Sequence, residues 1–162
     1  MARVYLETSF ISYLTAVPRE SRDPIAAAHQ QITIEWWSRR RRDFDLVVSQ
    51  IVIDEIQVGE PSLAKNRVTV VADLPRLLVT DQAVTLATNI LLKGFLPQKA
   101  LPDALHIAIA TVHQVDYLLT WNCKHIANQE VLPRIARLCA GQGLMLPIIC
   151  TPEELLGVAN DN

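Results

Sequence analysis

The chain has few glycines and no paired cysteines, and both shortages narrow the class of protein. Only five glycines occur among its 162 residues, and no segment matches the G-x-x-x-x-G-K-[ST] phosphate-binding loop, which argues against a nucleotide-hydrolysing enzyme of that type. The three cysteines are widely spaced and form no C-x-x-C pair. This pattern is typical of reduced thiols in a cytoplasm and argues against a structural zinc site.

Long apolar runs and an excess of positive charge are also missing. No uncharged run reaches the length of about 20 residues that a helix needs to cross a bilayer, and acidic Glu7 interrupts the first apolar stretch, unlike in a signal peptide. Fifteen Lys and Arg stand against seventeen Asp and Glu, so any contact with nucleic acid would use a local patch. We therefore expect a cytoplasmic protein without a membrane segment.

The chain does contain short apolar segments, and strand-like segments alternate with helix-like ones along it. Its length and 50% hydrophobic content suit one domain over residues 1–162. The segments 3–6, 45–49, 76–80, 115–121 and 144–150 are expected to be strands, and helical patterns separate them. Strands that alternate with helices indicate right-handed βαβ units. The sequence therefore predicts an α/β fold of three layers, α/β/α, with a mostly parallel central sheet of about five short strands.

Helix boundaries are marked by capping residues and prolines. Asp23 with Pro24 is expected to begin a helix that runs into an arginine cluster, and Asp81 is expected to cap a later one. The segment 103–113 is almost entirely apolar, so its helix should be covered on both sides. A last helix is predicted over 126–139, with a break near Pro133.

Four oxygen-bearing residues lie close to the ends of these elements. Glu7 and Asn122 directly follow predicted strands, Asp103 opens a helix, and Glu55 lies in the helix after the second strand. Because ligands gather at the carboxyl edge of parallel sheets, these side chains are expected to meet there. Clustered carboxylates repel one another unless a cation neutralises them, and hard oxygen ligands suit Mg²⁺ or Mn²⁺.

Each of these residues also has a purely structural interpretation. Asp103 could complement the helix dipole, Glu55 could be a solvated helix residue, and Asn122 could serve a turn. Glu7 is harder to explain in this way, since an unpaired carboxylate between a buried strand and an apolar helix is costly. Their joint placement at one predicted edge favours a functional site.

Four segments resemble the PIN-domain family in order and spacing, over nearly the whole chain: VYLETSFI at 4–11, S-x-x-V-x-x-EI at 49–56, PDALHIA at 102–108 and LTWN at 119–122. The resemblance implies a divalent-metal nuclease centre in which Glu7, Glu55, Asp103 and Asn122 are catalytic. It also implies that Glu7, Asp103 and Asn122 hold Mg²⁺, with Mn²⁺ as the alternative. One departure is that the first acid is usually Asp in this family, and Glu7 is longer by a methylene.

The small size of the chain is similar to that of the VapC-like toxins, ribonucleases encoded beside an antitoxin that blocks their site. The resemblance thus implies hydrolysis of an RNA phosphodiester by metal-activated water, an RNA substrate and an antitoxin partner. Two other functions stay open. The chain could be a catalytically weak or inactive RNA- or protein-binding module, or a phosphatase of the α/β type.

Further candidates surround the four residues in sequence. Thr8, Ser9 and Thr120 could hydrogen-bond the metal ligands, although helix capping and turn formation explain them equally well. His125 could approach the phosphate or transfer a proton. His106 and His113 fall on the apolar helix and are expected to be packed or surface residues, because no soft ligand accompanies them.

One basic and aromatic segment precedes the second strand. Arg39, Arg40, Arg41 and Arg42 could contact RNA phosphates, but arginines at the end of a helix also complement its dipole. Trp36 and Trp37 are expected to pack in the core, to stack on bases or to line a homodimer interface.

Overall fold

Five parallel strands form one sheet in the part of the chain that the structure describes, residues 1–17 and 23–157 of a computed structural model. The strands lie in the order β3-β2-β1-β4-β5, and all four neighbouring pairs are parallel. Their bounds are β1 Arg3–Leu6, β2 Asp45–Ser49, β3 Arg76–Leu77, β4 Tyr117–Leu119 and β5 Ile148–Cys150. The predicted α/β fold with a parallel sheet is confirmed, although three strands are shorter than expected.

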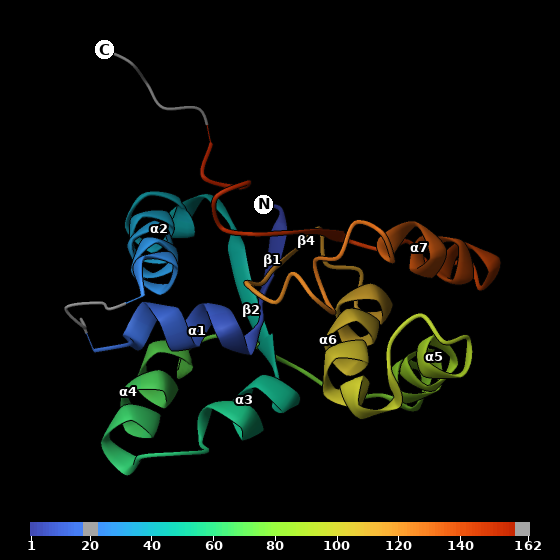
Figure 1. Ribbon diagram of the computed structural model, residues 1–162, viewed down its shortest axis with the longest axis horizontal. Helices are drawn as coiled ribbons and strands as arrows, with labels where there is room; N and C mark the ends of the chain where they lie inside the picture. Colours follow the sequence, from blue (N-terminus) through green and yellow to red (C-terminus); the bar gives the residue numbers. More distant parts are fainter. Residues whose placement is uncertain (18–22, 158–162) are drawn as a thin grey trace.

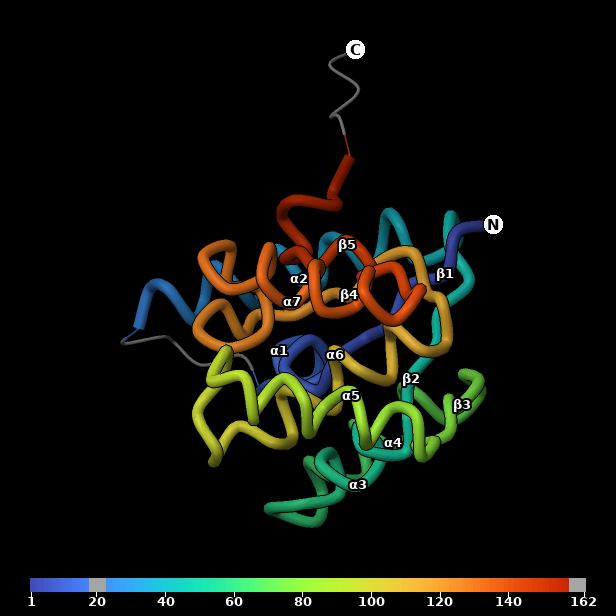
Figure 2. Tube along the Cα trace, turned by 90° about the vertical axis from the view of Figure 1, so that its right-hand side faces the viewer, coloured from blue at the N-terminus to red at the C-terminus, as the bar shows by residue number. Residues whose placement is uncertain are grey.

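Helices cover both sides of the sheet and give the expected three layers. Figure 1 shows α1, α2 and α4 on one side of the strands and α5, α6 and α7 on the other. Figure 2 shows the second side face-on, with α5 below α7. The helices are α1 Thr8–Thr15, α2 Pro24–Arg40, α3 Gln50–Ile56, α4 Pro61–Val71, α5 Asp81–Leu92, α6 Leu101–Val112 and α7 Leu132–Gly141, with short 3₁₀ turns at Arg41–Asp43 and Gln98–Ala100.

Two predicted helix starts are wrong, and both have a local cause. Thr80, not Asp81, caps α5, because its hydroxyl accepts from Ala83 N at 3.1 Å and Asp81 is already helical. The expected helix over 126–139 begins only at Leu132. Pro133 therefore lies in the first turn of α7, where its missing N–H costs no helical bond, and it does not break a longer helix.

The core lies on both faces of the central strand. Val4, Tyr5 and Leu6 of β1 are fully buried, as expected for a strand covered by helices on both sides. Helix α6 is buried along most of its length, which confirms the sequence prediction for this segment. No helix within the described ranges is long and apolar enough to cross a membrane.

The two tryptophans are buried to different degrees, and both pack against the core. Trp36 is fully buried, with its ring 5.5 Å from that of Phe10 and 5.9 Å from that of Phe44. Its Nε1 donates to Leu155 O at 3.1 Å, so the residue ties α2 to the C-terminal segment. Trp37 is only partly buried. For Trp36, the packing interpretation is the one that the structure supports.

The strand ends bring three distant segments to one edge. Glu7 N, directly after β1, donates to Leu119 O of β4 at 3.1 Å, and Thr120 N donates to Cys150 O at 3.1 Å. The ladder therefore continues for one residue past each strand. Glu7 and Thr120 are held beside each other at the carboxyl edge of the sheet, close to the start of α1.

Candidate active site

Glu7 is a buried carboxylate that also caps a helix. Its side chain is 7% exposed, and its extended backbone directs Oε2 to Ser9 N of the first turn of α1, at 3.0 Å. The same oxygen accepts from the Ser9 hydroxyl and, at 2.8 Å, from Thr120 Oγ1. Three donors therefore converge on Oε2. This explains how a carboxylate can lie at this buried position without a cationic partner on the same oxygen.

Glu55 does lean toward this edge from α3. Its Oε1 accepts from Thr8 Oγ1 at 2.9 Å and lies 2.5 Å from His106 Nε2. Burial raises the pKa of the Glu55 carboxyl, but the hydrogen bond with His106 and its electrostatic attraction, together with the Thr8 hydroxyl, outweigh it. The net pKa lies below the ordinary value of 4.5, so the carboxylate is ionised at neutral pH.

His106 is the residue at this site that the sequence analysis missed. Its side chain is fully buried, and its Nε2 lies 2.5 Å from Glu55 Oε1 and 3.9 Å from Glu7 Oε1. On the other side of the ring, Nδ1 lies 2.7 Å from the hydroxyl of Tyr5. One signal could have indicated it: His106 follows Asp103 by three residues, so both lie on the same face of α6.

Two buried hydroxyl groups, of Tyr5 and Ser49, lie on the Nδ1 side of the His106 ring. The Tyr5 hydroxyl lies 2.7 Å from Ser49 Oγ, and Ser49 Oγ accepts from Val52 N at 3.3 Å as the cap of α3. Burial raises the pKa of Tyr5 well above its ordinary value of 10, so the phenol keeps its proton. Residues from β1, β2, α3 and α6 thus form one buried polar chain that ends at Glu55.

Asp103 and Asn122 meet through His125. Asp103 Oδ2 lies 2.8 Å from His125 Nδ1, and Asn122 Oδ1 accepts from His125 N at 3.0 Å. Asn122 therefore caps the turn that follows β4, which is the structural role considered for it. His125 contacts the aspartate directly, which places it beside the metal ligands that the resemblance implies.

Thr120 joins this pair to Glu7. Its Oγ1 donates to Glu7 Oε2 and accepts from Asn122 N at 2.9 Å. Ser9 makes a parallel connection, because its hydroxyl accepts from Trp121 N at 2.8 Å. Hydrogen bonds and the His106 contact thus link all four predicted site residues, which come from segments far apart in the sequence.

The oxygen atoms left over fit the chemistry of a hard cation. Each carboxylate is anchored through one oxygen, and within the described ranges Glu55 Oε2 and Asp103 Oδ1 have no hydrogen-bond partner. Glu7 Oε1 has only the His106 contact at 3.9 Å. Mg²⁺ and Mn²⁺ prefer such oxygens. Nevertheless, no three His, Cys, Asp or Glu side chains among residues 1–17 and 23–157 converge closely enough to hold a metal in this arrangement.

The arginine cluster lies away from this site. Arg39 pairs with Glu35 at 2.6 Å, Arg40 pairs with Asp43 at 2.8 Å, and the Arg41 guanidinium lies 5.2 Å from the Trp37 ring centre. The cluster precedes β2, whereas the candidate site follows the strands. The structure therefore separates the predicted RNA-contacting arginines from the four site residues by the length of the sheet.

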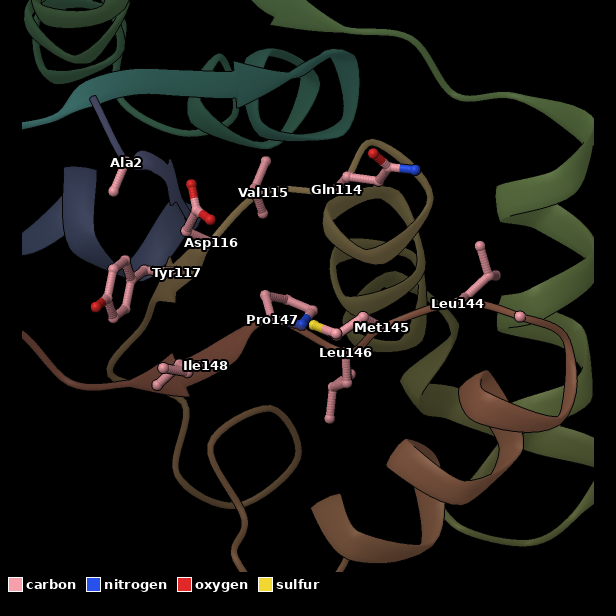
Figure 3. Close-up of a pocket in the computed structure, with 11 residues that line it drawn as sticks. Ala2, Gln114, Val115, Asp116, Tyr117, Leu144, Met145, Leu146, Pro147 and Ile148 are labelled. Carbon is pink, nitrogen blue, oxygen red and sulfur yellow. The ribbon is translucent and has the colours of Figure 1, made fainter.

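A cavity of about 520 Å³ also lies at the amino edge of the sheet, opposite the candidate site. Figure 3 shows its lining, with Ala2 before β1, Asp116 and Tyr117 at the start of β4, and Met145 to Ile148 leading into β5. The lining carries one carboxylate, and Asp116 Oδ2 already accepts from Arg3 N at 2.7 Å. This cavity lacks the convergent acidic groups of the other edge.

Comparison with known proteins identifies the fold. No family model and no curated protein matches the chain. Several solved structures are similar to it, and two of them illustrate the match. A chain of a toxin–antitoxin complex from Klebsiella pneumoniae is 16% identical with a TM-score of 0.57, and the match covers 92% of this chain and 97% of that one. A chain of VapBC2 from Rickettsia felis, bound to a DNA fragment from its promoter, is 14% identical with a TM-score of 0.54, covering 92% and 98%.

The class that fold and topology define is therefore the PIN-like α/β/α domain. The fold that the resemblance of the sequence motifs implied is confirmed, because both of these structures share it. At these identities the similarity shows the architecture, whereas the chemistry of the site depends on its own residues.

Proposed function

We propose that this protein is a divalent-metal-dependent ribonuclease that hydrolyses RNA phosphodiester bonds and acts as the toxin of a toxin–antitoxin module. The observation that carries the proposal is the linked set of Glu7, Glu55, Asp103 and Asn122 at the carboxyl edge. The carboxylates keep one oxygen outside the hydrogen-bond network. A cluster of anchored carboxylates suits the binding of a cation better than the binding of an anion.

Glu7, Asp103 and Asn122 would hold Mg²⁺ or Mn²⁺, and Glu55 would complete the ligand set or orient the attacking water. When bound, the ion lowers the pKa of water and offsets the charge of the scissile phosphate. The chain itself supplies orientation. Ser9 and Thr120 fix one oxygen of Glu7, and Thr8 and His106 fix one oxygen of Glu55. Preorganised groups of this kind need no rearrangement when charge develops on the phosphate.

We propose an antitoxin partner because proteins of similar fold occur in toxin–antitoxin complexes. One of the similar structures is a toxin–antitoxin complex, and another is VapBC2 bound to a DNA fragment from its promoter. An antitoxin for this chain would cover the carboxyl edge and exclude RNA from it. A cytoplasmic location and a homodimer belong to the same proposal.

The first test compares two aspartates that occupy the same kind of helix position. Asp103 and Asp81 both lie in the first turn of a helix, but only Asp103 belongs to the site. Asp103→Asn should abolish metal-dependent cleavage of a pool of structured and single-stranded RNAs, whereas Asp81→Asn should leave it unchanged. If both aspartates serve only the helix dipole, the two variants will cleave equally well.

One observation favours the alternative of a catalytically weak binding module. In this structure Glu55 and Asp103 are each paired with an imidazole, and the described acidic side chains do not gather around one point. A protein of this kind would bind RNA or a protein partner with equal affinity in Mg²⁺ and in chelator. Cleavage that needs metal and disappears in Asp103→Asn excludes this alternative.

A further inference from the structure

The imidazole of His106 lies near both glutamates of the site. Its ring is fully buried, with Nε2 at 2.5 Å from Glu55 Oε1 and at 3.9 Å from Glu7 Oε1. Glu55 itself is 36% exposed on a short helix, so its long side chain has room to turn into solvent. Two donors oppose this, Thr8 Oγ1 and His106 Nε2, and both bind the same oxygen.

The contact with Glu55 fixes which nitrogen of His106 carries a proton. An ionised carboxylate only accepts, so the proton between Glu55 Oε1 and His106 belongs to Nε2. In the tautomer that carries this proton, Nδ1 is an acceptor, and the Tyr5 hydroxyl at 2.7 Å can donate to it. Ser49 Oγ accepts from Val52 N and lies 2.7 Å from the Tyr5 oxygen, so it holds the phenol in place.

We propose that His106 is a positioning residue for the metal centre: its Nε2–H holds Glu55 beside Glu7, and Tyr5 and Ser49 fix the ring and the tautomer that this requires. The inference rests on the proposed function, because it needs Glu55 to serve a bound cation. Groups that orient metal ligands in this way change metal affinity by about 10- to 100-fold when they are removed.

Two substitutions separate the two edges of the imidazole. In His106→Gln the amide nitrogen can take the place of Nε2, so the donor to Glu55 is kept and the acceptor for Tyr5 is lost. In His106→Asn the side chain reaches only as far as Nδ1, so the contact with Tyr5 is kept and the donor to Glu55 is lost. Both variants replace the same buried ring by an amide, which matches their effects on packing.

The readout is the affinity for Mn²⁺, measured at pH 7 by the electron paramagnetic resonance signal of the free ion. His106→Asn should weaken binding by about 10-fold or more, and His106→Gln should stay within about threefold of the unchanged protein. Excess Mn²⁺ should restore RNA cleavage by His106→Asn, because the defect lies in holding the ion. The same pair of changes at His113, which ends α6 with Nε2 at 2.8 Å from Leu78 O, should leave Mn²⁺ affinity unaltered.

A structural role predicts a different result. If His106 only stabilises the fold, the melting temperatures of both variants will fall while Mn²⁺ affinity per folded molecule stays equal to that of the unchanged protein, and this overturns the inference. Tyr5→Phe covers the case in which His106→Asn does not fold. It removes the hydroxyl at Nδ1 and leaves both His106 and Glu55 in place, so Mn²⁺ binding should weaken, and unchanged binding contradicts the proposal.

Failure of the proposed function is distinguishable from failure of this inference. If the unchanged protein binds no Mn²⁺ and cleaves no RNA, the metal centre itself is wrong, and the role of His106 falls with it. If the unchanged protein binds Mn²⁺ and cleaves RNA, and His106→Asn does both equally well, only the positioning role is wrong.

Discussion

The chain builds the same helix cap twice, at Glu7 and at Glu60. In each case a glutamate caps a helix, and a serine two residues later donates both its backbone N–H and its hydroxyl to the carboxylate, Ser9 in α1 and Ser62 in α4. At exposed Glu60 both oxygens are used, Oε1 by Ser62 N at 3.1 Å and Oε2 by the Ser62 hydroxyl and Leu63 N. At buried Glu7 all the hydrogen bonds fall on Oε2.

The difference comes from the surroundings of the two caps. Thr120 approaches Glu7 from β4 and shares Oε2 with Ser9, which leaves Oε1 facing the imidazole of His106. Glu60 is exposed to solvent, its donors come from its own helix, and the charge of Arg67 attracts its carboxylate. Identical local chemistry therefore gives a capping residue on the surface and a candidate metal ligand at the sheet edge.

The largest expected effect is on activity. Glu7→Gln keeps the size and the acceptor oxygen of the side chain but removes the charge that a cation needs, so metal-dependent RNA cleavage should fall by about 100-fold or more. Glu60→Gln makes the same change in the same cap and should cleave at the rate of the unchanged protein. Initial rates with a labelled RNA measure both, and equal losses would show that capping alone accounts for Glu7.

A smaller effect is expected on stability when the tertiary donor is removed. Thr120→Val keeps the shape of the side chain but deprives Glu7 Oε2 of a donor and Asn122 N of an acceptor, so unfolding should become easier by about 1–3 kcal/mol. Ser62→Ala removes a donor from the exposed cap and should cost about 0.5 kcal/mol or less. Urea unfolding curves give both values. A larger cost for Ser62→Ala would contradict the contrast between the two caps.

The smallest expected effect is a pH dependence at the exposed cap. Hydrogen bonds from the Ser62 side chain, Ser62 N and Leu63 N lower the pKa of Glu60 below its ordinary value of 4.5. A carboxyl with a lowered pKa in the folded state contributes stability above pH 4.5, and this contribution is lost as the pH falls through the folded pKa. The melting temperatures of the unchanged protein and Glu60→Gln should therefore converge between pH 7 and pH 3. A constant difference over this range would mean that the cap does not depend on the charge.

The strand-and-helix order was readable from the sequence because it follows short apolar runs and capping residues. The parallel sheet, the burial of α6 and the position of Glu7 after β1 agree with those expectations. Helix starts were less readable where two capping residues are adjacent, as at Thr80 and Asp81. Pro133 is compatible with the late start of α7, because a helix accepts proline in its first turn. From the sequence alone, the same proline could equally mark a break inside a longer helix.

The candidate site was readable from the sequence in its acidic members and in polar residues near an element boundary, such as Ser9, Thr120 and His125, which contact those members in the structure. Glu7, Glu55 and Asp103 carry a charge close to an element boundary, and this can be seen without the fold. His106 could not be found in this way, because the partner that gives it a role, Glu55, lies 51 residues away on another helix. The arginine cluster shows the reverse case, since its charge suggested a site but its place before β2 puts it at the far edge.

The most direct test of this account is a titration of Mn²⁺ into the unchanged protein, Glu7→Gln and Glu60→Gln, followed by the signal of the free ion. The account predicts that the unchanged protein and Glu60→Gln bind Mn²⁺ with the same affinity and that Glu7→Gln loses most of this binding. An unchanged protein that binds no Mn²⁺, or a Glu7→Gln variant that binds it as well as Glu60→Gln does, would contradict the claim that the buried cap is part of a metal centre.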